Sequence, residues 1–585
     1  MSLKIITNKS KVAGTIIALA FLLVLPSILY GQLPGFGGAD SFFHISRYMD
    51  TAMQIKTGHY SFFQQFFTLN NSGKIVNALY GPLVAYFQGL LLNIVHFNGI
   101  IWWYLYLFQI NLIGIGSMYW LQRENGVAKK KSLMLGILFV VAGNVTVTVV
   151  SGAYAFGYAF FPLIVSAAIR LLKNREQPIK FWELVLSITV LAQTHVLSLV
   201  LGLIVYALAF IVYIFSRKNI KAIFKTIKVL VVAALTVLVV NFNVYGAYIE
   251  VMHSNSKIIS PFTPTQMYFN TVIDFGNISF ASISGIVFIA LLIAWAVRFA
   301  QWKESQLADK FALIVSLLFL LIAMGIININ GIPGMTTFQF LTRFFLITFT
   351  FGLYSLGQYS EQNISKYGSV VLIVATIGGA AIYLQQTIPV GVDSTTTSKK
   401  LTNSIPPLDS DELTYQVYTR PMAFTDQSIY KHAKMPMGLA DYLPNDSPFE
   451  EDYKSEVASS NAFNAYFSSE ILQNNNFKGR NLERKVGNNS MIVSWTSNTG
   501  GVEQLPIIKY AHTELTLNGK KLPNNYSNLS YIGTVSVQSK KGVNTLKVSY
   551  KPSLWFVIGS WIQILGVLSI VLITGGYVII RRFRV

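Results

Sequence analysis

The stretch FWELVLSITVLAQTHVLSLVLGLIVYALAFIVYIF, residues 181–215, decides how this chain folds. Its 35 residues are almost all apolar, and basic residues flank both ends. One helix of that length would measure about 50 Å at 1.5 Å per residue, whereas the hydrocarbon core of a membrane is about 30 Å thick. Because loops rich in Lys and Arg stay in the cytoplasm, both ends belong on that side. We therefore expect a tight helical hairpin whose turn, QTHVLS, places His195 at the outer surface.

The composition of the whole chain is that of an integral membrane protein. Its 585 residues are 52% hydrophobic and 12% charged, and the mean hydropathy is +0.49. A net charge of +20 would suggest nucleic acid binding in a soluble chain, but here Lys and Arg lie in short loops between apolar runs and set the topology. The absence of cysteine excludes disulfides, thiolate catalysis, iron–sulfur clusters and zinc–thiolate sites.

The remaining apolar runs predict about twelve crossings with both termini in the cytoplasm. The first run lacks a small-residue cleavage site, so we expect an uncleaved span. Residues 80–97 are predicted to lie along the membrane surface or to re-enter it, because a full crossing would put the lysines at 129–131 outside. Besides the hairpin, the predicted spans are 12–30, 99–121, 132–151, 154–172, 229–248, 282–297, 311–327, 338–356, 370–384 and 553–580.

The sequence divides into three predicted units. Residues 1–384 form a multi-span module whose first outer loop, 31–98, carries surface helices; 385–552 form an extracytoplasmic domain; 553–585 form a final transmembrane helix and a basic tail. The outer domain begins with an acidic, loop-like half. Its second half alternates as strands do and predicts a small β-sandwich with Asn518-Gly519 as a hairpin turn. The predicted strands are 491–495, 505–510, 514–517, 534–538 and 545–550.

The predicted fold class is therefore an α-helical polytopic membrane protein of about 12 transmembrane helices with a C-terminal, mainly β domain outside the cytoplasm. Its first outer loop opens with GADSFFHISRY, residues 38–48. Asp40, His44 and Arg47 stand there at i, i+4 and i+7, so a helix would place all three on one face. A second interpretation stays open, in which Asp40 is only a helix N-cap and the two cations are solvated or snorkel at the membrane edge.

Two further ionisable residues are predicted at the same outer face, His195 at the hairpin turn and Arg343 at the outer end of a span. Such groups are costly near a span and are functional candidates by default. Ordinary roles remain open for each: a neutral His195 bonded to a backbone carbonyl, a structural ion pair or snorkelling for Arg343, and an interfacial aromatic at a helix start for Tyr80.

Such a set suits group transfer from an anionic lipid at the membrane face. A carboxylate can take the proton from an acceptor hydroxyl, and cations can hold a phosphate that becomes the leaving group. Arginine suits the phosphate because its planar fork binds two oxygens, and histidine could assist or could bind a divalent cation with Asp40. The sequence has no P-loop, G-x-S-x-G, H-E-x-x-H or dinucleotide fingerprint, so we do not expect nucleotide-driven chemistry.

The order of these features resembles the GT-C superfamily of polyprenyl-phosphate-dependent glycosyltransferases. It resembles more closely the bacterial YfhO-type membrane proteins and those labelled 6-pyruvoyl-tetrahydropterin synthase-related, although nothing here offers a soluble zinc or pterin site. Where that group has Q-F-P-W-R-F, this chain has QFLTRFF from Gln339, so Leu341-Thr342 replaces Pro-Trp and the expected bend is altered. The other matching elements are DSFFHISR, ALYGPLVAYF, THVLS, LNGKKLP and VSYKPS.

The resemblance implies a GT-C-like fold and an inverting glycosyltransferase in a bacterial cell membrane, with its active site outside the cytoplasm. The implied donor is a sugar on undecaprenyl phosphate, and the acceptor is a cell-envelope glycan, teichoic acid or glycolipid. Membrane lipids, and no nucleic acid, would be the other partners. A divalent cation, Mg²⁺ or Mn²⁺, could be held by Asp40 and His44. The implied roles are catalytic base for Asp40, donor-phosphate binding for Arg343 and Arg47, and cavity lining for His44, His195, Tyr80 and Gln339.

Two other functions fit the same sequence. About twelve spans also suit a transporter or flippase for a lipid-linked or anionic substrate, although charges at mid-membrane depth would then be expected and here they gather at one face. A noncatalytic envelope-assembly protein would use its β domain to bind a partner, and would tolerate replacement of Asp40 by Asn.

Overall fold

The computed structural model describes most of the membrane part and the C-terminal strands. The described residues are 2–29, 35–36, 39–146, 153–217, 219–255, 298–358, 482–530 and 532–583, with short pieces at 258, 267, 291–293, 295–296, 422–423, 442–444 and 471. Side chains at 2–9, 35–36, 39–42, 144–146, 153, 422–423 and 573–583 are not described. The predicted span 370–384, most of the predicted span 282–297 and most of the acidic stretch 385–481 lie outside these residues. The division into three units therefore stays a prediction.

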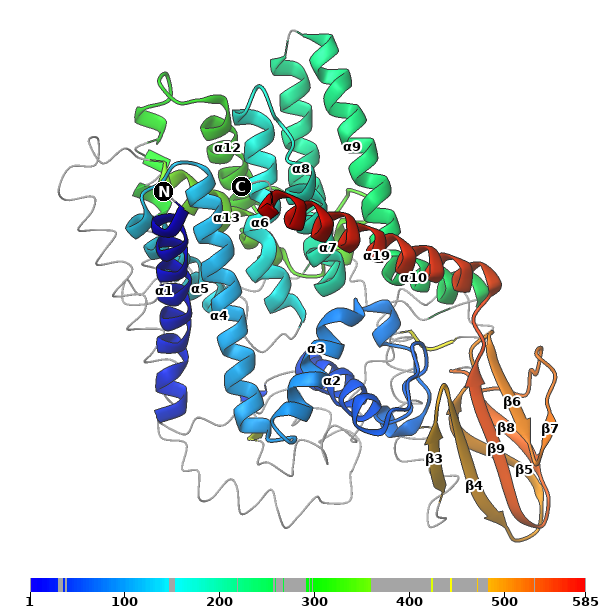
Figure 1. Ribbon diagram of the computed structural model, residues 1–585. Helices are drawn as coiled ribbons and strands as arrows, with labels where there is room; N and C mark the ends of the chain where they lie inside the picture. Colours follow the sequence, from blue (N-terminus) through cyan, green and yellow to red (C-terminus); the bar gives the residue numbers. More distant parts are fainter. Residues whose placement is uncertain are drawn as a thin grey trace.

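A helix bundle forms the body of the molecule (Figure 1). Helix α4 packs against α1, α5 and α6, while α6 also packs against α7 and α8, and α12 packs against α13. Large apolar side chains fill the centre, where Phe139, Phe161 and Phe351 are fully buried. The bundle helices are α1 (Ser2–Leu29), α4 (Gly99–Glu124), α5 (Lys129–Thr146), α6 (Ala153–Lys173), α7 (Phe181–Thr194), α8 (Val196–Ser216), α9 (Ile220–Val240), α12 (Leu307–Ala323), α13 (Phe345–Gly357) and α19 (Leu554–Phe583).

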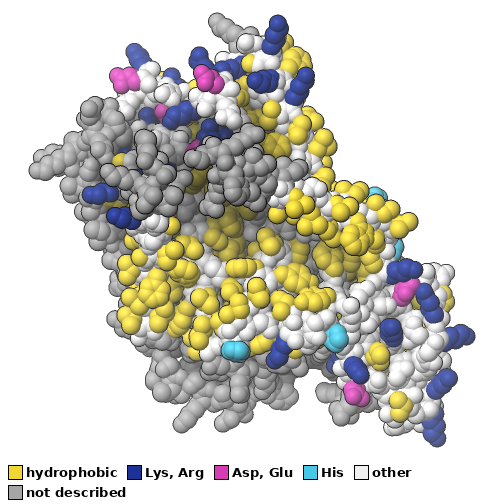
Figure 2. All heavy atoms as spheres, in the orientation of Figure 1, with side chains coloured by type: hydrophobic (Ala, Val, Ile, Leu, Met, Phe, Trp, Pro, Cys, Tyr) yellow, Lys and Arg dark blue, Asp and Glu magenta, His cyan; other side chains and the backbone are white. Residues whose placement is uncertain are grey.

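The surface of the bundle is that of a multi-pass membrane protein. Within the described residues, six helices are long and apolar enough to cross a membrane: α1, α4, α6, α8, α9 and α19. Helices α9 and α19 are the most exposed of them, although both are strongly apolar. Figure 2 shows hydrophobic side chains in a band across the middle of this face, with Lys and Arg gathered above it. This pattern matches a hydrocarbon core beside a basic membrane edge. The number of crossings, about twelve, stays a prediction.

The predicted hairpin is confirmed, because His195 alone separates α7 from α8. The start of α7 lies beside the end of α4, where Lys180 Nζ is 2.6 Å from Glu124 Oε2. The end of α8 lies at the same place, since Ser216 and Glu124 line one cavity. Both ends of the 35-residue stretch therefore share one side of the bundle, which we call the basic end. His195 belongs to the opposite end, which we call the outer end after its predicted location.

The predicted span 229–248 has the wrong bounds. Helix α9 begins nine residues earlier, at Ile220, because the side chain of Asn219 caps it by accepting from the Ala222 N–H at 3.2 Å. Its three lysines follow at i, i+4 and i+7 on one exposed face, so their aliphatic stems can extend toward the membrane edge. The helix ends at Val240, and α10 (Phe242–Ser254) follows directly after Asn241. Glu250, which follows the predicted end of that span, lies in α10 and is fully buried.

The predicted first outer loop, 31–98, contains two helices, α2 (Ala39–Thr57) and α3 (Pro82–Ile94), with single 3₁₀ turns η1 (Leu69–Asn71) and η2 (Asn77–Leu79) between them. Their location at the membrane surface stays a prediction. One face of α3 packs against α2. The other face exposes four apolar side chains at i, i+4, i+7 and i+11, which are Leu83, Phe87, Leu90 and Ile94. A helix with one apolar exposed stripe is suited to lie in the plane of a membrane surface.

The C-terminal strands form the predicted β-sandwich. A five-stranded sheet of order β3-β4-β9-β6-β7 and a two-stranded sheet of β5 and β8 share one apolar core. Asn518 and Gly519 turn at φ 49° and 82°, as predicted. Strands β3 and β7 were not predicted. The strands are β3 (Glu483–Gly487), β4 (Ser490–Ser497), β5 (Gly501–Ile508), β6 (Thr513–Leu517), β7 (Lys520–Lys521), β8 (Thr534–Ser539) and β9 (Gly542–Tyr550); β1 (Gly35–Phe36) pairs separately with β2 (Met422–Ala423).

The sandwich is docked on the first outer loop. The Ile508 N–H donates to the carbonyl of Ser72 at 2.8 Å, and the Ile75 N–H donates to the hydroxyl of Tyr510 at 3.0 Å. The rings of Phe63 and Tyr550 stack at 4.3 Å. Because these bonds hold residues 60–75, the strands also fix the position of the turn that follows at residues 77–81.

Candidate functional site

The face of α2 that carries the first candidate residues is helical, as predicted. The helix begins at Ala39, so Asp40 lies in its first turn rather than at the N-cap position. The helical spacing places Asp40, His44 and Arg47 on one face. The side chain of Asp40 lies outside the described part of the chain, so its catalytic role stays a prediction.

Arg47 is fully buried at the centre of this face. Its Nε donates to the Asn77 Oδ1 at 3.0 Å, and its Nη2 donates to the carbonyl of Tyr80 at 3.2 Å and to that of Gly81 at 3.4 Å. Its guanidinium carbon lies 4.9 Å from the centre of the Tyr80 ring. Arg47 therefore ties α2 to the turn that begins α3.

His44 is the fourth partner of this guanidinium. Its Nδ1 lies 3.0 Å from Arg47 Nη1, so Nδ1 accepts the hydrogen bond and the proton of the neutral ring is on Nε2. Burial, followed by the charges of Arg47 and His195, lowers the pKa of His44 well below its usual range. The ring packs edge-on against Phe43 and Tyr80. His44 is thus a neutral imidazole at physiological pH.

The turn at Tyr80-Gly81 joins this face to the hairpin. Gly81 has φ +69°, and a Cβ at this position would lie 2.7 Å from the carbonyl oxygen of Gln193 at the end of α7. Only glycine permits this contact. The centre of the Tyr80 ring lies 5.0 Å from that of Phe43 and 5.7 Å from that of Tyr442. The ring is therefore held between α2 and Tyr442.

His195 connects α7 and α8 and belongs to neither. Its Nδ1 caps α8 by accepting from the Ser198 N–H at 3.2 Å, rather than bonding to a backbone carbonyl. The neutral ring therefore carries its proton on Nε2, which forms no hydrogen bond with any residue whose position is described. Burial, then the charges of Arg343 and Arg47, lowers the pKa of His195 to about 3. The Tyr154 ring lies 5.0 Å away.

Arg343 lies in the second of two short 3₁₀ helices, η4 (Met335–Phe338) and η5 (Leu341–Phe344), at the outer end of α13. Gln339 stands between them at φ +59°, so the chain bends there although Leu341-Thr342 replaces Pro-Trp. Arg343 Nη2 donates to the Gln339 Oε1 at 3.1 Å, and its guanidinium lies 5.4 Å from the Phe340 ring centre. The bend and this bond together orient the arginine.

The structure brings candidate residues from three separate segments together. The charges of both arginines depress the pKa of His195, and His195 in turn depresses that of His44, so these groups share one electrostatic environment. Across the described residues, no three His, Asp or Glu side chains are placed to bind a metal. Arg47 also occupies the Nδ1 of His44. Two imidazoles among guanidinium groups suit an anion better than Mg²⁺ or Mn²⁺.

Two supporting residues were missed by the sequence analysis. Asn77 accepts from Arg47, and its place just before Tyr-Gly-Pro was the only available signal. Asp50 is fully buried and accepts from the Phe67 N–H at 3.0 Å and from the Gln54 Nε2 at 2.6 Å, which fastens the loop to α2. Burial raises the pKa of Asp50 to about 7. Asp50 stands one helical turn after Arg47, but sequence spacing alone does not reveal these partners.

The fold and the site define a mostly helical, multi-pass membrane protein with a C-terminal β region. No family model matches the sequence, and no curated protein matches it. Similar solved structures include the arabinofuranosyltransferase AftD from Mycobacteria, with 13% identity and a TM-score of 0.43, covering 65% of this chain and 27% of that one.

Two others are from Archaeoglobus fulgidus. The oligosaccharyltransferase AglB with an inhibitory peptide and a dolichol-phosphate has 13% identity and a TM-score of 0.33, covering 76% of this chain and 62% of that one. The oligosaccharyltransferase with zinc and sulfate has 14% identity and a TM-score of 0.32, covering 72% and 61%. This chain spans less than two thirds of each of the three. The likeness is weak, so the function of the site is inferred from its own residues.

Proposed function

We propose that this chain is an extracytoplasmic glycosyltransferase of the GT-C type. It moves a sugar from a polyprenyl-phosphate donor, undecaprenyl phosphate in a bacterial membrane, to a cell-envelope glycan, teichoic acid or glycolipid. The observation that carries the proposal is that the turn held by Arg47 of α2 packs at Gly81 against the end of α7, beside His195, while the charges of Arg47 and Arg343 both act on His195. A carboxylate on a cationic face is the minimum that base-assisted transfer from a phosphate requires.

Each candidate side chain has a defined role in the proposed reaction. Asp40 accepts the proton of the acceptor hydroxyl while that oxygen forms a bond to the anomeric carbon of the sugar. The bond from that carbon to the phosphate oxygen breaks on the opposite face, and the polyprenyl phosphate leaves with the electron pair, so the configuration inverts. Arg343 stabilises the charge on the departing phosphate, and the Nε2–H of His195 can donate a hydrogen bond to it.

Arg47 has a positioning role in this proposal. It was expected to bind the donor phosphate, but it is fully buried and its guanidinium already contacts Asn77, His44 and the carbonyls of the Tyr80 turn. It therefore supports the site by fixing His44 and Tyr80. Arg343 remains the arginine proposed to contact phosphate.

The outer loop supports a lipid-linked donor. Helix α3 starts at the Gly81 turn and exposes its apolar stripe next to the site. A polyprenyl chain could lie against this stripe while its phosphate reaches the cations, because the polar and apolar parts of the donor would then meet surfaces of their own kind.

The test is a transfer assay on the purified full-length chain in lipid vesicles. Labelled undecaprenyl-phosphate sugars are offered with cell-envelope acceptors, and Asp40→Asn is compared with Glu304→Gln, an exposed carboxamide control at the basic end. We expect Asp40→Asn to lower turnover by about 10²-fold or more with an unchanged melting temperature, and the control to retain full turnover. Undiminished turnover in Asp40→Asn would remove Asp40 as the base, and movement of the labelled lipid across the vesicle without transfer would favour a flippase.

A further inference from the structure

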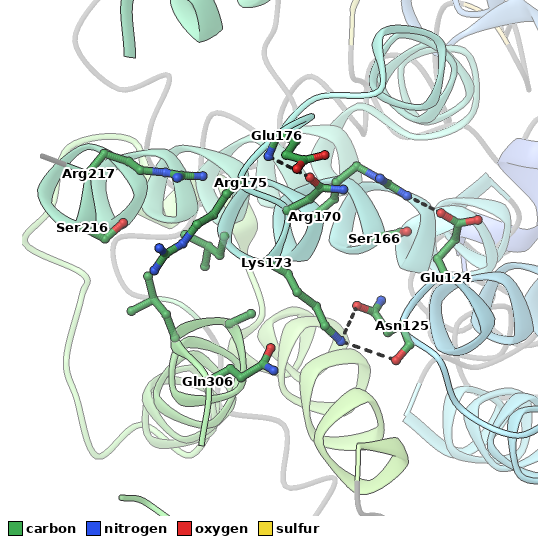
Figure 3. A pocket seen from close by; sticks show the side chains of 14 residues that line it. Glu124, Asn125, Ser166, Arg170, Lys173, Arg175, Glu176, Ser216, Arg217 and Gln306 are labelled. Atoms are coloured by element: carbon green, nitrogen blue, oxygen red, sulfur yellow. Dashed lines mark hydrogen bonds and ion pairs between the residues drawn. The ribbon is translucent and has the colours of Figure 1, made fainter. Parts of the chain in front are cut away.

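A second polar site lies at the basic end of the bundle, far from the site described above. A cavity of about 720 Å³ opens where α4, α6 and α8 end and where α12 begins (Figure 3). This volume is within the usual range for small-molecule sites. None of the residues that line it belongs to the proposed glycosyltransferase machinery.

The cations around this cavity outnumber the carboxylates. Arg170 is neutralised within the protein, by an ion pair with Glu124 and another with Glu183 at 3.0 Å. The other three lining cations differ, since none of them forms an ion pair with a carboxylate in the described part of the chain. They are Lys173, Arg175 and Arg217, and the remaining carboxylate of the lining is Glu176.

The contacts of Lys173 and Arg217 are with neutral groups. The Nζ of Lys173 lies 3.4 Å from the carbonyl and side-chain oxygens of Asn125 and from the Gln358 Oε1, which is the outer limit of a hydrogen bond. The Arg217 guanidinium lies 5.1 Å from the ring centre of Tyr213. Figure 3 shows Lys173, Arg175 and Arg217 around the same hollow. The cavity is therefore built with an excess of positive charge.

The N-terminus of α12 adds to this charge. Gln306, Leu307 and Ala308 line the cavity, and they are the N-cap and the first two residues of this 17-residue helix. The Gln306 side chain forms no capping hydrogen bond. The first N–H groups of a helix have no partner within the helix and carry a positive partial charge, which favours an anion.

We propose that this cavity binds the phosphate group of an anionic ligand at the basic edge of the membrane, and that the phosphate is the headgroup of an anionic phospholipid. Phosphate suits the site because Arg175 and Arg217 offer planar donor forks and Lys173 a third charge. The position of the cavity favours a lipid as the source of the phosphate, because the cavity lies where membrane helices end and where lipid headgroups are found. Basic pockets between transmembrane helices bind such headgroups.

The test measures the melting temperature of the purified full-length protein in detergent during titration with phosphatidylglycerol, phosphatidylcholine or glycerol 1-phosphate. We expect phosphatidylglycerol, and not phosphatidylcholine, to raise the melting temperature. The double variant Arg175→Gln/Arg217→Gln should need roughly 30-fold more phosphatidylglycerol for the same shift, because each cation near the surface strengthens binding of an anionic headgroup several-fold.

The matched control is Lys129→Gln/Lys130→Gln, which removes the same charge from exposed residues of α5 outside the cavity and should titrate as wild type. An equal shift with glycerol 1-phosphate would support the phosphate site and identify a soluble source. Equal shifts with the two lipids, or equal losses in the two double variants, would overturn the proposal. Native mass spectrometry gives the second readout, with bound phosphatidylglycerol retained by wild type and lost from Arg217→Gln alone.

Discussion

Two arginines at opposite ends of the bundle are stabilised in different ways. At the basic end, Arg170 forms ion pairs with Glu124 and Glu183. At the outer end, Arg47 is fully buried, and the partners of its guanidinium are an amide, an imidazole and two carbonyls. All of these partners are neutral, and burial lowers the pKa of Arg47.

The charge of Arg170 is therefore balanced by carboxylates, whereas the charge of Arg47 is only hydrogen-bonded to neutral groups. A buried charge is costly unless it is paired, and protein carboxylates meet that need at Arg170. Around Arg47 the described side chains supply hydrogen bonds but no negative charge. The carboxylate of Asp40 and the phosphate that Arg343 is proposed to bind would offset the charge of Arg47 without contacting its guanidinium, whose hydrogen bonds are already made within the protein.

The largest loss of stability is expected at Arg170, the arginine paired with two carboxylates. Arg170→Met should lower the free energy of unfolding by about 3 kcal/mol, because it leaves Glu124 and Glu183 without their shared cation in a largely buried place. Reversible unfolding of the purified protein in detergent measures this. Adding Glu183→Gln should recover part of the loss, and a further loss in that double variant would show that the ion pair is not the cause.

A smaller loss of stability is expected at Arg47, the arginine whose partners are all neutral. Arg47→Met should cost about 2 kcal/mol, because it leaves only neutral acceptors unsatisfied, and it should strongly lower turnover by releasing His44 and Tyr80. Arg47→Lys should not restore turnover, since one ammonium cannot reproduce the planar fork. A stability loss as large as that of Arg170→Met, relieved by Asp40→Asn, would instead identify Asp40 as an ionic partner of Arg47.

The smallest stability difference is expected between substitutions of two glycines, one at each end of the bundle. Gly81 and Gly126 have φ +69° and +85°, but a Cβ on Gly81 would strike the carbonyl of Gln193, whereas one on Gly126 would meet open space. Gly126→Ala should therefore cost about 1 kcal/mol for the left-handed conformation alone, and Gly81→Ala about 2 kcal/mol. Thermal unfolding of the two variants measures the difference. Equal losses would show that the turn can move away from α7.

The parts of the fold that the sequence predicted are those governed by local pattern. The length of 181–215 and the charge at both ends require a hairpin, and the alternation at 491–495 or 545–550 requires strands. The end of α9 at Asn241 was not predictable, because one asparagine in an apolar run gives no strong stop signal. The packing of α10 and the burial of Glu250 depend on tertiary contacts.

The candidate site was predictable as a list of residues but not as a geometry. Membrane topology places His195 and Arg343 at one face, yet the bond between Arg47 and Asn77 joins residues 30 positions apart and leaves no periodic trace. The cap formed by His195 follows only from the turn of the hairpin. The side chain of Asp40 lies outside the described residues, so its assignment as the base still rests on its position in α2.

The docking of the β-sandwich on the first outer loop imposes an order on biogenesis. Ile75 bonds to Tyr510, a residue 435 positions later in the chain. At translation rates of about 5–20 residues per second, the loop waits roughly 20–90 s for this partner. During that interval the Tyr80 turn lacks its support from the strands, so the loop completes its structure only after the C-terminal strands have been synthesised and have folded against it. A chain truncated before β5 would be inserted in the membrane with residues 60–81 incompletely folded, and would be an early target for quality-control proteases.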